Sequence, residues 1–145
     1  MSSAKSKARQ CAVQALYQWQ MTGQNLSTIE REFKEDQRLK NAQKSYFSDL
    51  FHGVPKNLDK IDASMVDFVD RDVEKIDPVE RAILRIGVYE LLQKPEIPYR
   101  VVINEGVELA KCFGADGSHR YVNGVLDKVA KVQRKLEIEA KQKKS

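Results

Sequence analysis

Hydrophobic residues recur at steps of three and four positions along most of this chain. From Ala8 to Trp19 they advance by 3, 1, 3, 1 and 3 positions, which is one stripe of an amphipathic α-helix. The pattern predicts a helix from about Ala4 to Met21. Gly23 follows it, and glycine commonly ends a helix because it adopts a left-handed backbone without strain.

Two further helical segments are predicted before residue 70. The string Ser27-Thr28-Ile29-Glu30 resembles a capping box and predicts a second helix to about Lys40. Apolar residues then recur at helical spacing from Phe47 to Phe68, which predicts a long third helix. Pro55 lies inside that pattern and lacks a backbone N–H, so we expect a kink or break near Gly53 to Pro55.

The string Asp77-Pro78-Val79-Glu80 is the clearest local signal in the chain. Asp is favoured at the N-cap and Pro at the first helical position, and Glu two residues later is placed to reach back to the N-cap amide. We therefore expect a helix that begins at Pro78 and ends before Pro95.

The remaining pattern predicts two more helices. One has a buried stripe from Val102 to Phe113 and ends at Gly114 in a left-handed cap. The other is capped by Ser118, has a stripe from Val122 to Val129 and continues into a lysine-rich extension. No useful strand alternation is present, so the predicted fold is all-α with six or seven helices.

Composition favours one compact domain spanning residues 1–145. The chain has 41% hydrophobic residues, and 145 residues are enough to bury a sizeable core. We expect a basic, frayed tail from about residue 131. Glutamines interrupt the apolar positions after the basic N-terminus, which argues against a secretory signal, and the apolar runs are too short to span a bilayer. The sequence therefore indicates a cytoplasmic protein that does not enter the membrane.

Charge is unevenly distributed along the chain. The net charge is +4, and residues 1–10 carry three basic residues and no acidic one. Residues 59–80 carry eight acidic residues against three basic ones, a net of 3 − 8 = −5. Such an asymmetry suits a protein that approaches phosphates on one side and a basic protein on the other. Solvated helix faces explain the same pattern equally well.

The sequence offers little chemistry for catalysis. It contains no phosphate-binding loop, dinucleotide-binding glycine string, zinc-protease motif, EF-hand or serine nucleophile motif. His52 and His119 are its only histidines, and Cys11 and Cys112 lack the spacing of a zinc ribbon. We expect both cysteines in the core, no metal, no cofactor and no enzymatic activity. A deep pocket lined by clustered acidic residues would favour an enzymatic function instead.

RNA binding has better support. The first predicted helix carries Lys5, Arg9 and Tyr17, and the last begins with Ser118, followed by Arg120 and Tyr121. Cations bind phosphates, a helix N-terminus attracts anions, and tyrosine rings stack on the exposed bases of single-stranded RNA. Alternatively, both tyrosines pack at helix joints. A helical adaptor without an RNA role remains the competing class.

Four strings, in order over about residues 4–130, resemble the NusB family of bacterial transcription antitermination factors. They are Ala8-Arg9-Gln10-Cys11-Ala12-Val13-Gln14-Ala15-Leu16-Tyr17-Gln18-Trp19, Asp77-Pro78-Val79-Glu80-Arg81-Ala82-Ile83-Leu84-Arg85, Ile103-Asn104-Glu105-Gly106-Val107-Glu108-Leu109-Ala110-Lys111, and Phe113-Gly114 followed by Tyr121-Val122-Asn123-Gly124-Val125-Leu126-Asp127-Lys128. The resemblance extends to an RNA-binding domain attached to some ribosomal RNA methyltransferases, but this chain carries no methyltransferase domain. This sequence has Gly117 at a position where members of the family commonly carry an acidic residue.

The resemblance implies two three-helix bundles packed crosswise and no enzymatic activity. It implies binding to the boxA element of ribosomal RNA leaders as a heterodimer with ribosomal protein NusE, within a complex that includes NusA, NusG and RNA polymerase. A homodimer of the free protein is compatible with the same pattern. By position, the residues on the RNA side are Lys5, Lys7, Arg9, Tyr17, Ser118, Arg120 and Tyr121, and those on the NusE side are Glu80, Arg81 and Leu84.

Overall fold

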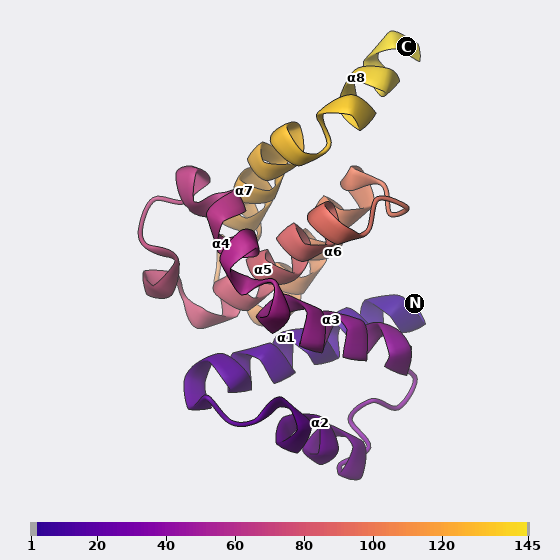
Figure 1. The fold of residues 1–145 in the computed structure, drawn as a ribbon, viewed down its shortest axis with the longest axis vertical. Helices are drawn as coiled ribbons and strands as arrows, with labels where there is room; N and C mark the ends of the chain where they lie inside the picture. The colour runs from indigo at the N-terminus through magenta and orange to yellow at the C-terminus, as the bar shows by residue number, and fades with distance from the viewer. Residues whose placement is uncertain (1–2, 145) are drawn as a thin grey trace.

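The computed structural model of the chain describes residues 3–144, and this part confirms the all-α prediction. It contains helices and no strand (Figure 1). The α-helices are α1 (Ala4–Thr22), α2 (Leu26–Glu35), α3 (Lys44–Lys56), α4 (Leu58–Met65), α5 (Pro78–Gln93), α6 (Tyr99–Phe113), α7 (Ser118–Gln133) and α8 (Lys135–Lys144). Two short 3-10 helices, η1 (Val66–Phe68) and η2 (Val73–Lys75), lie between α4 and α5.

The helices pack in two neighbouring groups around a continuous core. Helix α1 packs against α2 and α3, and α5 packs against α4, α6 and α7. Helices α1 and α3 also contact α5, so α5 lies at the centre of the molecule (Figure 1). Helix α8 extends α7 away from the body at the C-terminal end. No described helix is long and apolar enough to cross a membrane.

Within residues 3–144 there are eight α-helices rather than the six or seven expected, because two predicted helices are each divided. The long third helix is interrupted at Asn57, two residues after Pro55, which stays inside α3. The Asn57 side chain donates to the Gly53 carbonyl at 2.8 Å. The last helix is interrupted at Arg134, whose guanidinium turns inward to bind backbone carbonyls.

Helix α2 is shorter and begins earlier than predicted. Asn25, not Ser27, is its N-cap, and the Asn25 side chain accepts from the Ser27 amide at 2.8 Å. The helix ends at Glu35 instead of Lys40. Residues 36–43 form a loop in which Gln37 and Asn41 have positive φ values of 56° and 68°. A left-handed residue ends a helix, and the sequence pattern gives no sign of Gln37 taking this conformation.

Helix α5 begins where the sequence predicts. The Asp77 carboxylate accepts from the amides of Val79 and Glu80, both at 3.1 Å. The predicted return of the Glu80 side chain to the cap is wrong. Its carboxylate instead accepts a hydrogen bond from the Ser118 hydroxyl at 2.5 Å, because tertiary packing brings the start of α7 beside the start of α5.

The predicted left-handed cap at Gly114, between α6 and α7, is wrong. Gly114 is extended, with φ −88°, and the left-handed residue is Gly117, with φ 85°. Gly117 is the N-cap of α7, so Ser118 is the first helical residue rather than the cap. Gly114 allows close packing, since a Cβ there would lie 2.6 Å from the Cβ of Ser118. Cys112 is exposed, contrary to our expectation of a core position.

Candidate nucleic-acid interface

Arg9 is not on the surface. It lies on the buried side of α1, is 2% exposed, and its guanidinium binds the carboxylate of Glu90 on α5 with an Nη2 to Oε2 distance of 2.9 Å. The same guanidinium lies 5.4 Å from the centroid of the Tyr46 ring. The prediction of an exposed cation at Arg9 is therefore wrong, because the helical stripe turns this side chain inward.

Arg9, Glu90 and Tyr46 form a buried polar cluster that joins three helices. The Tyr46 hydroxyl on α3 donates to Glu90, and Arg9 Nη1 lies 3.5 Å from Glu105 on α6. Burial raises the pKa of Tyr46, and the Glu90 carboxylate raises it further. Tyr46 therefore remains a neutral donor at physiological pH. Buried polar groups that are fully paired fix the relative positions of the helices that carry them.

Lys5 and Lys7 lie at the start of α1 and are partly exposed. The Lys5 ammonium is 4.9 Å from the centroid of the Tyr46 ring, an arrangement that orients the side chain through a cation–π contact. The start of α1 therefore carries two partly exposed cations.

Tyr17 is 40% exposed and lines a groove of about 470 Å³. The groove lies where α1 meets the loop before α3, the start of α5 and the end of α6, and its walls include Met21, Arg38, Val79 and Phe113. The ring is therefore accessible to a planar ligand, in contrast to the alternative in which Tyr17 packs at a helix joint. Base stacking is the chemistry that this surface offers.

The residues predicted to bind RNA in the first turn of α7 differ in exposure. Arg120 is exposed, whereas Ser118 is 4% exposed and donates to Glu80. Tyr121 is partly buried against the core, and its hydroxyl donates to Asp70 at 3.3 Å. Burial raises the pKa of Tyr121, and Asp70 adds to the rise. Tyr121 is thus held by packing and by Asp70, and Arg120 is the accessible cation of this turn.

The residues predicted for a protein partner are mostly internal. Leu84 is fully buried, and Arg81 is 6% exposed and donates to the carbonyls of Glu74 at 2.9 Å and Ile76 at 3.3 Å. The expectation that these two side chains face a partner is wrong, since residues 81–91 of α5 are buried on every side. Glu80 is partly exposed but accepts a hydrogen bond from Ser118, a residue predicted to lie on the RNA-binding side.

Part of the acidic middle segment is neutralised within the molecule. Arg85 is 2% exposed, and its guanidinium binds Asp62 at 2.9 Å and Glu74 at 3.0 Å. Sequence reasoning missed this internal role of Arg85, and it also missed the role of Glu90 as the buried partner of Arg9. The available signal was the presence of charged side chains on a helix that is otherwise apolar on all faces, because a charge on such a helix needs an internal partner.

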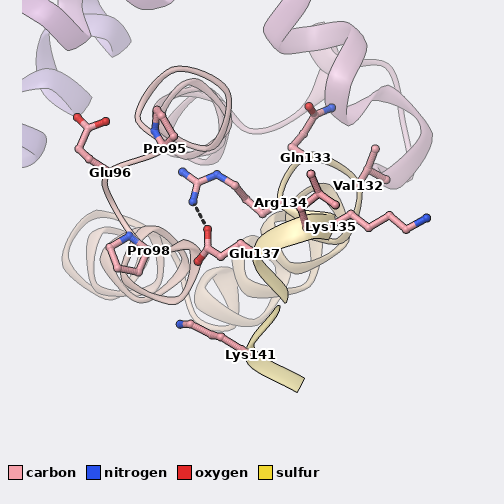
Figure 2. A pocket seen from close by; sticks show the side chains of 10 residues that line it. Pro95, Glu96, Pro98, Val132, Gln133, Arg134, Lys135, Glu137 and Lys141 are labelled. Carbon is pink, nitrogen blue, oxygen red and sulfur yellow. Dashed lines mark hydrogen bonds and ion pairs between the residues drawn. The ribbon is translucent and has the colours of Figure 1, made fainter. Parts of the chain in front are cut away.

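A separate hollow of about 540 Å³ lies where α7 meets α8 (Figure 2). The buried guanidinium of Arg134 points into the body there, donating to the carbonyls of Leu91 and Ile97 at 2.9 Å and to Glu137 at 2.6 Å. These bonds hold the end of α5 against α7, so this arginine is structural. Among the described residues, no group of three or more His, Cys, Asp or Glu side chains could hold a metal ion.

The exposed residues that are predicted to bind RNA lie along α1 and beside its C-terminal half. Gln20 near the end of α1 donates to the Pro78 carbonyl at 2.9 Å, and the Ser118 to Glu80 bond brings α7 to the same place. The start of α7, which carries Arg120, therefore lies near the C-terminal half of α1, which carries Tyr17. Lys5 is 12 residues before Tyr17, roughly 18 Å along the helix. An extended single strand of RNA is long enough to reach both.

Comparison with known proteins identifies the family. The model of the NusB family matches residues 6–131. The chain belongs to the NusB family. It is 51% identical to the transcription antitermination protein NusB of Nitrosococcus oceani over 97% of this chain and 95% of that protein. It is 50% identical to the NusB of Pasteurella multocida over 90% of each chain.

Solved NusB structures share the fold. The NusB of T. maritima superposes with a TM-score of 0.74 at 29% identity, covering 90% of this chain and 93% of the other. A NusB crystallised with NusE and double-stranded RNA superposes with a TM-score of 0.80 at 29% identity, covering 91% of this chain and 99% of the other. The family therefore includes a member that is seen in a complex with both kinds of partner.

Proposed function

We propose that this NusB family member is a non-enzymatic transcription antitermination factor that binds boxA RNA of ribosomal RNA leaders together with NusE. The observation that carries the proposal is the superposition on the NusB that was solved with NusE and RNA, over 91% of this chain. The proposed ligand is a single strand, whereas that complex holds double-stranded RNA, so base stacking on Tyr17 is the feature to test.

In this proposal α1–α3 and α5–α7 form two three-helix bundles packed crosswise, and the RNA follows α1. Lys5, Lys7 and Arg120 bind phosphates, and Tyr17 and Tyr121 stack on bases. Arg9 and Ser118 act from the interior by holding α1 and α7 in place. The complete assembly works in the cytoplasm with NusA, NusG and RNA polymerase.

The RNA part of the proposal is tested by fluorescence anisotropy. A boxA RNA and a scrambled RNA are titrated with the protein alone and with NusE. We expect tighter binding of boxA that strengthens with NusE. Tyr17→Ala should weaken boxA binding by about 1–3 kcal/mol, the contribution of one stacked base. Val101→Ala, at an apolar residue that is 41% exposed on α6, is the control. Equal binding of both RNAs would reduce the protein to a nonspecific binder.

The NusE part of the proposal is tested at Glu80. We expect Glu80→Lys to weaken the heterodimer about tenfold or more by placing a like charge against a basic partner. Because Glu80 also accepts from Ser118, Ser118→Ala is the matched control that removes the hydrogen bond and keeps the carboxylate. Equal dissociation constants for the wild type and Glu80→Lys, measured by calorimetry, would remove Glu80 from the interface.

A further inference from the structure

Three lysines surround a hollow of about 250 Å³ beside the loop between α2 and α3. We name it the lysine hollow, and it is lined by Lys34, Gln37, Leu39, Lys40 and Lys44. The three lysines are exposed, while Leu39 is 2% exposed. None of these described lining residues is acidic. The hollow therefore concentrates positive charge.

The loop that carries the hollow is held in one shape by its own backbone. The Arg38 amide donates to the Phe33 carbonyl at 3.0 Å, and the Ala42 amide donates to the Leu39 carbonyl at 3.0 Å. The Arg38 guanidinium also lies 3.8 Å from the centroid of the Phe33 ring. Because the backbone beneath the lysines is already ordered, an anion that binds here need not fix the loop first.

The lysine hollow lies beside the start of α1. The Gln43 amide donates to the Ala4 carbonyl at 2.9 Å, and the Cys11 thiol donates to the Arg38 carbonyl at 3.3 Å. Lys7 is three residues after Ala4 and four before Cys11, so all three lie on one stripe of α1. Lys7 therefore lies on the stripe of α1 that faces this loop.

The same loop reaches the groove that exposes Tyr17. Arg38 lines that groove, and its Nη2 donates to the Gln14 side chain of α1 at 2.7 Å. Gln14 is three residues before Tyr17, which is less than one helical turn. The loop therefore lies between the cations at the start of α1 and the aromatic ring farther along the helix.

We propose that Lys34, Lys40 and Lys44 form a second RNA-binding element that holds the sugar–phosphate backbone of RNA lying along α1. This inference rests on the proposed function and adds to it a surface outside the residues assigned above. A single strand carries one phosphate per nucleotide, and a strand that stacks on Tyr17 has the lysine hollow within its path. Lysine contacts to phosphate carry no sequence information, so the element acts on every RNA alike.

The test measures the dependence of RNA affinity on salt. In Lys34→Gln/Lys40→Gln/Lys44→Gln, three phosphate contacts are lost. The slope of log affinity against log salt should become shallower by about 2, since each contact to single-stranded RNA contributes about 0.7. Affinity at low salt should fall about tenfold or more, by a similar factor for boxA and for scrambled RNA.

The matched control is Lys56→Gln/Lys60→Gln/Lys75→Gln, which removes the same charge from exposed lysines in α3, α4 and η2. The control should shift the slope by less than half as much. If the lysine-hollow variant had the same salt slope as the wild type, the inference would be overturned. The proposed function would still stand as long as the wild type preferred boxA RNA. A wild type that binds neither RNA would overturn both. Thermal unfolding of the variant checks that the fold is intact.

Discussion

Asp49 on α3 accepts hydrogen bonds from two directions. The Tyr89 hydroxyl donates to one carboxylate oxygen at 2.5 Å, and the Lys94 ammonium binds the other. Burial by itself would raise the pKa of Asp49, but the bonds from Lys94 and Tyr89 outweigh it and hold the pKa below its usual value. This carboxylate thus ties α3 to the end of α5, and its ion pair with Lys94 requires that it be ionised.

The lowered pKa makes the contribution of Asp49 depend on pH. A carboxyl whose pKa is lower in the folded state stabilises the fold above its unfolded pKa, and this stabilisation is lost as the pH falls through the folded pKa. We expect Asp49→Asn to lower the free energy of unfolding by about 1–2 kcal/mol at pH 7. Urea unfolding should show the difference shrinking below about pH 4.

The control for this residue is the exposed Asp36 at the end of α2. Asp36→Asn makes the same change of charge and should alter the free energy of unfolding by less than about 0.5 kcal/mol. A difference between the wild type and Asp49→Asn that stays constant from pH 7 to pH 3 would contradict the role assigned to the charge.

At the scale of the element, α7 depends on the conformation of the residue before it. Gly117 has φ 85° and is the N-cap of the helix that carries the buried Ser118 and the exposed Arg120. A left-handed backbone strains any residue that has a Cβ. Gly124 lies within the same helix, and a Cβ there would meet no atom within 4 Å. Glycine is therefore favoured at position 117 by the left-handed backbone, whereas none of the described residues around position 124 excludes a Cβ.

This difference gives opposite expectations for the same substitution. Gly117→Ala should lower the free energy of unfolding by about 1–2 kcal/mol, because alanine is strained at this φ. Gly124→Ala should raise the free energy of unfolding by about 0.5–1 kcal/mol, because alanine loses less backbone freedom in a helix. Thermal unfolding measures both. Changes of the same sign would show that backbone conformation does not control the start of α7.

At the scale of the whole molecule, the Arg9 and Glu90 pair joins the two groups of helices. It links α1 to the central helix α5, and the side chains are 3% and 1% exposed. Two charges leave water to form this pair, so its value lies in fixing one arrangement of α1 against α5 more than in net stability. The position of the RNA-facing side of α1 depends on this arrangement.

Breaking the pair should be far more costly than removing it. Arg9→Met should lower the free energy of unfolding by about 3–5 kcal/mol, because it leaves the Glu90 carboxylate buried and unpaired. Arg9→Met/Glu90→Gln should recover part of the loss. Arg31→Met, in an exposed pair with Glu35 at 3.9 Å, should change stability by less than about 1 kcal/mol. Urea unfolding that gave equal losses at Arg9 and Arg31 would contradict this account.

The sequence by itself determined the helices whose signals are local. Asp77 and Pro78 fixed the start of α5, and Gly23 fixed the end of α1, because caps act on the neighbouring amides and carbonyls. The apolar spacing determined the fold class, and the four strings indicated the family. Tyr17 was correctly predicted as a surface residue, since it lies off the apolar stripe of α1.

Only the tertiary structure decided which charged side chains are internal. Arg9, Arg81 and Arg85 look like surface cations in the sequence, yet each has a partner supplied by a residue outside its own helix. It also joined Ser118 to Glu80, which are 38 residues apart, and placed the lysine hollow beside α1. Local spacing predicts which face of a helix a residue occupies, but the partner that makes burial of a charge tolerable depends on how distant helices pack.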